Sequence, residues 1–113
     1  MIEMVAIWTE AAECALVDAD RHENAANLRF ARQSSRFAGG YYVAAGDASD
    51  SLEARLELLK KAETCYRRGQ SPDAKRVSAR VAALKSELRA RAVLQSEWAA
   101  QRHADGEEGK RST

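Results

Sequence analysis

Apolar residues recur every three to four positions along most of this chain, which is the period of helices with one buried face. The pattern is clearest in residues 51–68. One face of that stretch carries Leu52, Leu56, Leu59, Ala62 and Tyr66. Asp50 and Glu53 have the spacing of an N-terminal capping box, and Gly69 stands where a helix commonly ends. The pattern therefore predicts a helix over residues 51–68.

A second helix is predicted to follow directly. Ser71 is a suitable N-cap and Pro72 a suitable first helical residue, and the helical period then continues to about His103. The short connection favours an antiparallel hairpin. At 1.5 Å per residue the later helix is about 48 Å long and the earlier one about 27 Å.

This difference in length leaves the far end of the later helix without its hairpin partner. The apolar residues Val93, Leu94 and Trp98 lie in that end. Because clusters of large apolar groups are seldom left in water, another surface is expected to cover them. That surface is either the N-terminal helix of the same chain or a second subunit.

The N-terminal half has the same period but two possible divisions. Residues 2–17 and 28–42 both show helical spacing. Asp20 and Glu23 have the spacing of a capping box that starts a second helix, yet nothing forces a break, so the two stretches also fit one continuous helix. Gly39 and Gly40 lie inside the second stretch, where we expect a helix with a weak point rather than an extended segment.

These patterns predict an all-α fold of three or four helices, packed as antiparallel hairpins or a bundle with a long C-terminal helix. The chain has 113 residues, enough for a single domain over residues 1–103. One Pro and six Gly argue against an all-β sandwich. Residues 104–113 are charged and lack large apolar groups, so they are predicted to form a disordered tail.

Charge is balanced overall, at a formal +1, but it is uneven along the chain. Residues 1–27 carry six acids and one base, whereas residues 70–103 carry seven bases and three acids. We expect an acidic first helix to lie beside a basic last helix, because opposite charges commonly face each other in small bundles.

No membrane or export segment is expected. The longest run without a charged residue, 37–46, is too short to span a bilayer, and the first residues carry no basic leader. Cys14 and Cys65 lack C-x-x-C spacing, so both are expected to be reduced thiols. A cytoplasmic location fits this pattern.

The sequence offers little for catalysis or metal binding. Cys14, Asp18 and His22 share one helical face, but a fourth ligand is not evident. Apart from His22, the one imidazole is His103 near the end of the last helix, and no glycine-rich phosphate loop is found. We therefore expect no enzyme, no cofactor, no metal site and no small-molecule substrate.

The remaining interpretation is a protein-interaction module that acts as an adaptor, regulator or inhibitor on a larger protein, or forms a homodimer. Tyr, Trp and Arg are the residue types that most often anchor interfaces. The predicted contact residues are Arg29, Arg32, Arg36, Tyr41, Tyr42, Val93, Leu94 and Trp98. Tyr42 and Trp98 equally fit positions in the core.

Nucleic-acid binding is the alternative. Arg29, Arg32 and Arg36 form one helical stripe, and an adjacent face carries Phe30 and Phe37 beside Tyr41. Arginines beside aromatic rings suit a phosphate backbone and stacked bases. The opposing interpretation is that the arginines pair with acids at positions 10, 13 or 18. With a net charge near zero, this alternative ranks below protein binding.

Overall fold

The computed structural model describes residues 2–111, and the side chains of residues 3–102. Within this part of the chain all regular structure is helical. The four helices are α1 (Ile2–Asn24), α2 (Leu28–Ala48), α3 (Leu52–Arg68) and α4 (Asp73–Arg111). The predicted all-α fold with a long C-terminal helix is confirmed.

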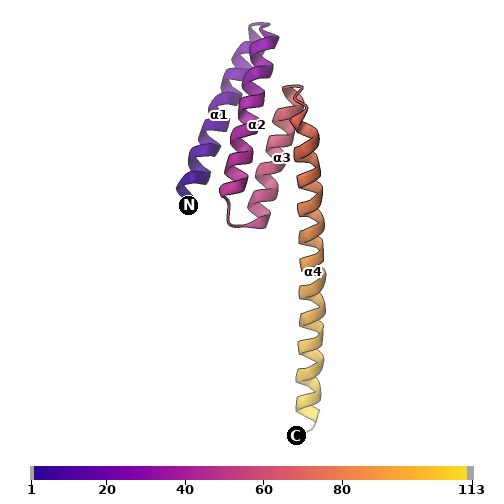
Figure 1. Cartoon of the computed structure of the whole chain (residues 1–113). Helices are drawn as coiled ribbons and strands as arrows, with labels where there is room; N and C mark the ends of the chain where they lie inside the picture. Colours follow the sequence, from indigo (N-terminus) through magenta and orange to yellow (C-terminus); the bar gives the residue numbers. More distant parts are fainter. Residues whose placement is uncertain (1, 112–113) are drawn as a thin grey trace.

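The helices pack side by side in the order of the chain, and each runs antiparallel to the next (Figure 1). Contacts join α1 to α2, α2 to α3 and α3 to α4. The acidic helix α1 and the basic helix α4 therefore lie at opposite edges, and the expectation that they would be neighbours is wrong. Short connections at 25–27, 49–51 and 69–72 place each helix against the next one, and the layer does not close on itself. An ion pair also reaches past a neighbour, from Arg80 on α4 to Asp47 on α2 at 2.6 Å. The molecule measures 76 × 28 × 19 Å.

The core lies along the contacts of α2 and α3 with their neighbours. Between α1 and α2 the buried residues are mainly alanines, which allow the two helices to approach closely: Ala12, Ala15, Ala19, Ala31, Ala38 and Ala45. Apart from Tyr42 on α2, the larger buried side chains are on α3 and the first part of α4: Leu56, Leu58, Leu59, Tyr66, Val77, Val81 and Leu84. Since α3 has a neighbour on each side, it buries Leu58 and Cys65 in addition to its predicted face.

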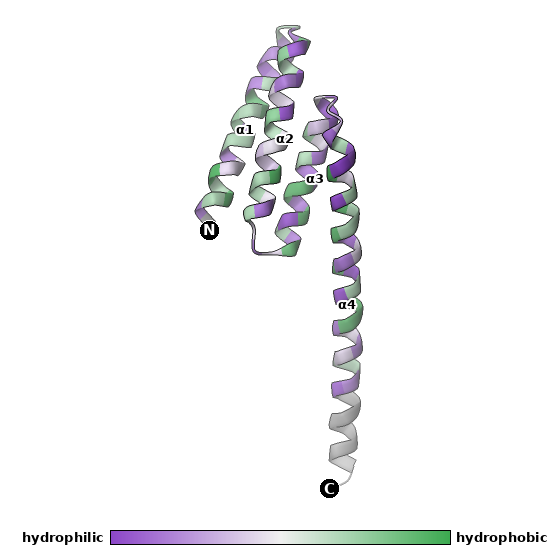
Figure 2. Cartoon of the chain, viewed as in Figure 1, coloured by the Kyte–Doolittle hydropathy of each residue, from purple (hydrophilic) through white to green (hydrophobic). Residues whose placement is uncertain are grey.

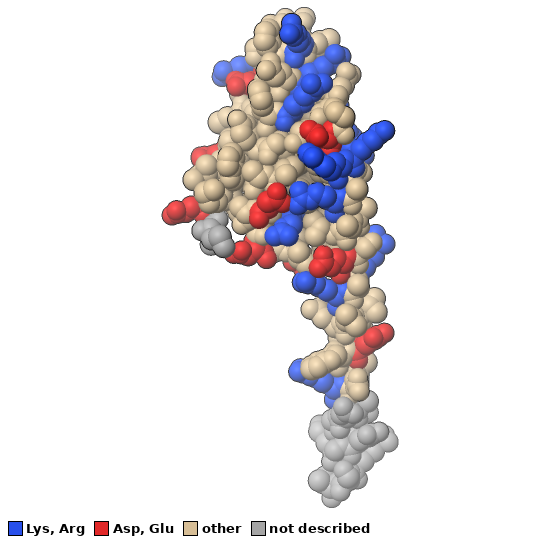
Figure 3. Space-filling model, viewed as in Figure 1, with Lys and Arg blue, Asp and Glu red and all other residues tan. Residues whose placement is uncertain are grey.

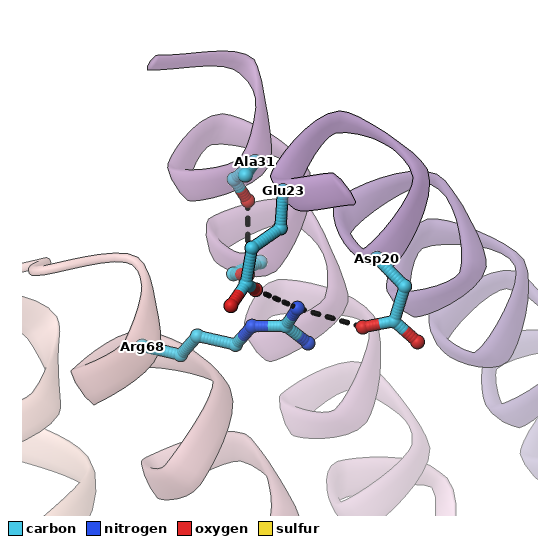
Figure 4. Close-up of polar contacts among 5 residues, drawn as sticks. Asp20, Glu23, Ala31 and Arg68 are labelled. Atoms are coloured by element: carbon cyan, nitrogen blue, oxygen red, sulfur yellow. Dashed lines mark hydrogen bonds and ion pairs between the residues drawn. The ribbon is translucent and has the colours of Figure 1, made fainter. Parts of the chain in front are cut away.

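The N-terminal half forms two separate helices. The turn between α1 and α2 places Ala26 in the left-handed region, at φ 60°. Asp20 and Glu23 do not cap a second helix; both carboxylates accept hydrogen bonds from Nη2 of Arg68 on α3, at 2.7 and 2.6 Å (Figure 4). These two hydrogen bonds raise the pKa of the Arg68 guanidinium above its ordinary value. The cluster ties α1 to α3 across the end of α2.

The start of α3 differs by one residue from the predicted cap. Ser51, not Asp50, is the N-cap, and its hydroxyl oxygen accepts a hydrogen bond from the backbone N–H of Ala54 at 3.3 Å. The same hydroxyl donates to the carboxylate of Glu53 at 3.1 Å. Ser51 has the extended backbone that an N-cap requires, so the neighbouring Asp50 is left outside the helix.

The predicted end of the last helix also shifts, because α4 runs past residue 103 to Arg111. The side chains of residues 103–113 lie outside the described part, as does the backbone of 112–113. The disordered tail over 104–113 therefore stays a prediction.

Helix α2 continues through the glycine pair without a break. A Cβ built at Gly39 would lie 2.8 Å from Cδ1 of the buried Tyr66 ring, whereas a Cβ at Gly40 would meet only the Tyr66 hydroxyl, at 3.6 Å. The absence of a side chain at Gly39 lets this ring rest on the backbone of α2. The predicted weak point is thus a place of close contact between helices.

The two glycines should respond to alanine in opposite ways. Gly39→Ala should lower the free energy of unfolding by about 1–2 kcal/mol, because the buried Tyr66 ring must move. Gly40→Ala should raise it by up to about 1 kcal/mol, because alanine is the better helix former and the site has room. Urea unfolding followed by circular dichroism measures both. Equal effects at the two positions would contradict the described packing of Tyr66.

Candidate interaction surfaces

The most exposed part of the structure is the second half of α4. Packing of α4 on α3 ends at Leu88, which is half-buried against the core. From Arg89 to Arg102 every side chain is exposed. We call residues 89–102 the α4 extension. Figure 1 shows it passing well beyond the loop that joins α2 and α3. Neither α1 nor another described segment covers it.

The α4 extension carries three large apolar residues. Val93, Leu94 and Trp98 are 55%, 61% and 62% exposed. Consecutive residues of a helix point about 100° apart, so Val93 faces away from the side shared by Leu94 and Trp98. Leu94 and Trp98 line one open hollow with Gln95, Ala99 and Arg102. Figure 2 shows hydrophobic residues on α4 below the level of the α2–α3 loop.

The polar contacts of the α4 extension lie within α4 itself. The guanidinium carbon of Arg102 lies 4.5 Å from the centroid of the Trp98 ring, which is a cation–π contact. Arg91 pairs with Glu87 one turn earlier, at 3.3 Å. The Leu94–Trp98 side therefore carries one guanidinium on its ring, that of Arg102, and lies next to the ion pair of Arg91 with Glu87.

The arginine stripe on α2 forms a second surface. Arg29, Arg32 and Arg36 are exposed and line, with Gln33, an open hollow of about 420 Å³. Among the described residues, none of the three pairs with a carboxylate, so the expected ion pairs with positions 10, 13 or 18 are not formed. Arg36 and the backbone of Arg32 lie next to the α3–α4 turn at Gly69.

One of these arginines is fixed in place by the turn between α3 and α4. Arg36 Nε donates a hydrogen bond to the carbonyl of Gly69 at 2.7 Å, and Nη2 donates to the carbonyl of Gln70 at 3.3 Å. A Cβ at Gly69 would lie 2.6 Å from Cγ of Arg36 and 2.8 Å from the carbonyl oxygen of Arg32. Gly69 keeps an ordinary helical φ of −79°, and Gln70 takes the left-handed position, at φ 54°. Glycine is needed here for close approach rather than for its backbone freedom.

The two predicted tyrosine contacts lie largely within the fold. Tyr42 is 4% exposed, and the Lys61 ammonium lies 5.8 Å from its ring centroid. Burial raises the pKa of the Tyr42 phenol above its ordinary value, and Cys65 and Glu13 raise it further. Tyr41 stacks on Trp8 of α1, with ring centroids 5.9 Å apart. Tyr42 offers almost no surface to a partner, and Tyr41 offers only an edge.

A further apolar surface follows α1 and α2, and of its residues only Phe30 and Phe37 were candidates from the sequence. Its members are at least 47% exposed: Met4, Ile7, Val17, Leu28, Phe30 and Phe37. Phe37 and Tyr41 line a shallow hollow with Ala11 and Cys14 of α1. The signal was present in the sequence, because Met4, Ile7, Ala11 and Cys14 repeat at three and four residues beside the buried stripe of α1.

The residues considered for catalysis and metal binding do not come together in one site within residues 3–102. No group of three or more His, Cys, Asp or Glu side chains within residues 3–102 has the arrangement of a metal site. Cys14 is exposed and Cys65 is buried. Burial raises the pKa of the Cys65 thiol to about 11, although the positive charge of Arg68 opposes this.

The two thiols should therefore react very differently with iodoacetamide. Raising the pKa of Cys65 from 9.0 to about 11 lowers its thiolate fraction near neutral pH by about a hundredfold. Cys14 should be alkylated in the folded protein, and Cys65 only after unfolding in urea, which peptide mass spectrometry distinguishes. Rapid alkylation of Cys65 in the folded protein would contradict its burial in the core.

Comparison with known protein families, curated proteins and solved structures finds no match for this chain. None of the described helices combines the length and the apolar character needed to cross a membrane. A functional proposal for this chain therefore depends on its own geometry.

Proposed function

We propose that this chain is a non-enzymatic helical module that binds another protein through the α4 extension. The single observation that carries the proposal is that every side chain from Arg89 to Arg102 is exposed, although three of them are large and apolar. Most helical stability in proteins comes from packing an apolar face, and the α4 extension has no such packing within the described chain.

The residues of the α4 extension suit a helix that docks in a groove. Leu94 and Trp98 are one turn apart and project to the same side, as the anchors of helix-in-groove recognition do. Trp and Arg are also the most frequent energetic centres of interfaces. Arg102 beside Trp98 favours a groove with an acidic side chain at its rim, because charge complementarity speeds association and excludes wrong partners.

A photo-crosslinking amino acid tests the proposal. Benzoylphenylalanine placed at position 98, in cells that express the protein, should give a discrete crosslinked protein product on irradiation. The same amino acid in place of the exposed Lys75, near the start of α4, is the matched control and should give none. A chain that crosslinks at neither position, or equally at both, would refute a contact through the α4 extension.

A second candidate function rests on the arginine stripe. Three guanidinium groups line one hollow without a carboxylate partner among the described residues, and Phe30 and Phe37 are exposed beside them. This arrangement supports binding of single-stranded nucleic acid through phosphate contacts and base stacking.

Fluorescence polarisation with labelled single-stranded oligonucleotides tests this second candidate. If phosphate contacts dominate, affinity falls steeply as salt rises. Arg29→Ala with Arg32→Ala should then weaken binding by about tenfold or more and make it less sensitive to salt. Arg36 is left unchanged because it also holds the α3–α4 turn. Affinity that does not respond to salt or to these substitutions would exclude the stripe as a nucleic-acid site.

A further inference from the structure

We infer that the protein bound by the α4 extension is a second copy of this chain, and that α1 of that copy is the element that covers it. This inference rests on the proposed function and names its partner. It is argued from the charges at the two edges of the layer, from the exposed apolar residues on both helices and from the order in which the helices pack.

The two edge helices carry opposite net charges. On α1, Asp20 and Glu23 are neutralised by Arg68, but four exposed acids take part in no ion pair among the described residues: Glu3, Glu10, Glu13 and Asp18. The α4 extension carries Arg89, Arg91, Arg102 and Glu97. Of these, Arg91 pairs with Glu87, Arg102 lies against the Trp98 ring, and Arg89 takes part in no ion pair among the described residues. Acidic side chains predominate along the α1 edge in Figure 3, and basic ones along α4.

Both helices also present an apolar seam of similar spacing. On the outer side of α1, the exposed residues at 3, 7, 10, 14 and 17 alternate by four and three, with Ile7 and Val17 each more than half exposed. On α4, residues 87, 91, 94 and 98 follow the same alternation and include Leu94 and Trp98. This is the spacing with which two helices pack along a common seam. The α1 seam alternates two glutamates, Glu3 and Glu10, with its apolar residues. The α4 seam begins with the ion pair Glu87–Arg91 and continues with Leu94 and Trp98.

The topology of the chain accommodates this contact without rearrangement. Neighbouring helices are antiparallel throughout, and α1 and α4 are the two edges of the layer (Figure 1). A second α1 placed antiparallel to α4 continues the same order. Helix α1 has 23 residues, or about 35 Å, and so covers the whole α4 extension, which spans about 21 Å.

The same charges disfavour the simplest alternative, in which two α4 extensions pair with each other. Such a pair would bring together two segments, residues 87–102, that each carry three arginines and two glutamates and therefore a net positive charge. Like charges across an interface oppose association. The acidic edge of α1 has no such conflict.

Charge reversal on the two helices tests the inference by sedimentation velocity. One variant carries Glu10→Lys and Glu13→Lys on α1, and the other carries Arg89→Glu and Arg91→Glu on α4. The wild-type chain should self-associate, more weakly as ionic strength rises from about 0.1 M to about 1 M. Each variant alone should associate about tenfold more weakly.

An equal mixture of the two variants should recover association close to that of the wild type, because the reversed charges are then complementary. Lys60→Glu with Lys61→Glu on α3 is the matched control and should leave association unchanged. All substituted side chains are exposed, and circular dichroism verifies that each variant keeps its helices.

The outcomes separate this inference from the proposed function. A wild-type chain that stays monomeric, or a mixture that does not recover association, overturns the second-copy inference. If that monomer still crosslinks through position 98 to a different protein, the module function stands. If it neither associates nor crosslinks, both fail.

Discussion

Gly69→Ala should lower the free energy of unfolding by about 3 kcal/mol. The new Cβ would lie 2.6 Å from Cγ of Arg36 and 2.8 Å from the carbonyl oxygen of Arg32. The second of these is a backbone atom within α2, so the clash is relieved only if α2 and the α3–α4 turn separate. Separation would also break the 2.7 Å hydrogen bond from Arg36 to the Gly69 carbonyl. Urea unfolding monitored by circular dichroism measures the loss.

The neighbouring position supplies a control. Gln70 has a left-handed φ of 54°, a conformation that glycine adopts without strain. Gln70→Gly should therefore change the free energy of unfolding by no more than about 1 kcal/mol, since relief of strain opposes the added freedom of the unfolded chain. If Gly69→Ala proved as mild as Gln70→Gly, the close approach of this turn to α2 would not be a determinant of stability.

Leu59→Ala should lower the free energy of unfolding by about 3 kcal/mol, within the range seen when a buried leucine is cut back to alanine. Leu59 is 0% exposed and lies on α3, where its side chain reaches the backbone of α2 at Gly46. A thin layer of helices offers few side chains that can shift to fill the cavity. The midpoint of urea unfolding should fall with little change in its slope.

Leu94→Ala makes the same chemical change on the α4 extension. Leu94 is 61% exposed, so the substitution should alter stability by no more than about 0.5 kcal/mol at concentrations where the chain is monomeric. A large loss at Leu94 under those conditions would mean that another part of the chain covers the α4 extension, which the described packing excludes.

The local elements could be predicted from the sequence because their signals are local. The four-residue recurrence of leucines marked α3, and Ser71 with Pro72 marked the start of α4, where the Ser71 hydroxyl accepts a hydrogen bond from the Asp73 N–H. The cap of α3 was misplaced by one residue because Asp50 and Ser51 are both good capping residues. The backbone conformation alone decides between them.

The arrangement of the helices was beyond the same reasoning. A helical period shows which face is buried but not which helix covers it, and the charge asymmetry suggested a contact between α1 and α4 that the layer does not form. The fixing of Arg36 by the Gly69 carbonyl depends likewise on how closely α2 approaches a turn more than thirty residues later.

The candidate surfaces also differ in how far the sequence alone predicts them. That α3 does not cover Trp98 and Leu94 followed from comparing two helix lengths, whereas their cover by α1 was left open and is not formed. The burial of Tyr42 could not be predicted in this way. The helical period of α2 does not show whether Tyr42 faces one of its two neighbouring helices or solvent. The exposed apolar residues of α1 were not recognised from the sequence, because they lie next to a buried stripe with the same helical period.

Close packing that joins only neighbouring helices has a consequence for how order is lost. Among the described residues α1 and α4 do not touch, and beyond their neighbours they are held only by exposed ion pairs, Arg68 with Asp20 and Glu23 and Arg80 with Asp47. Either edge helix can therefore separate while α2 and α3 stay packed. Protection of backbone amides against hydrogen exchange should then be greatest in α2 and α3 and lower in the edge helices α1 and α4. Unfolding should therefore be cooperative within each pair of neighbouring helices rather than across the whole molecule.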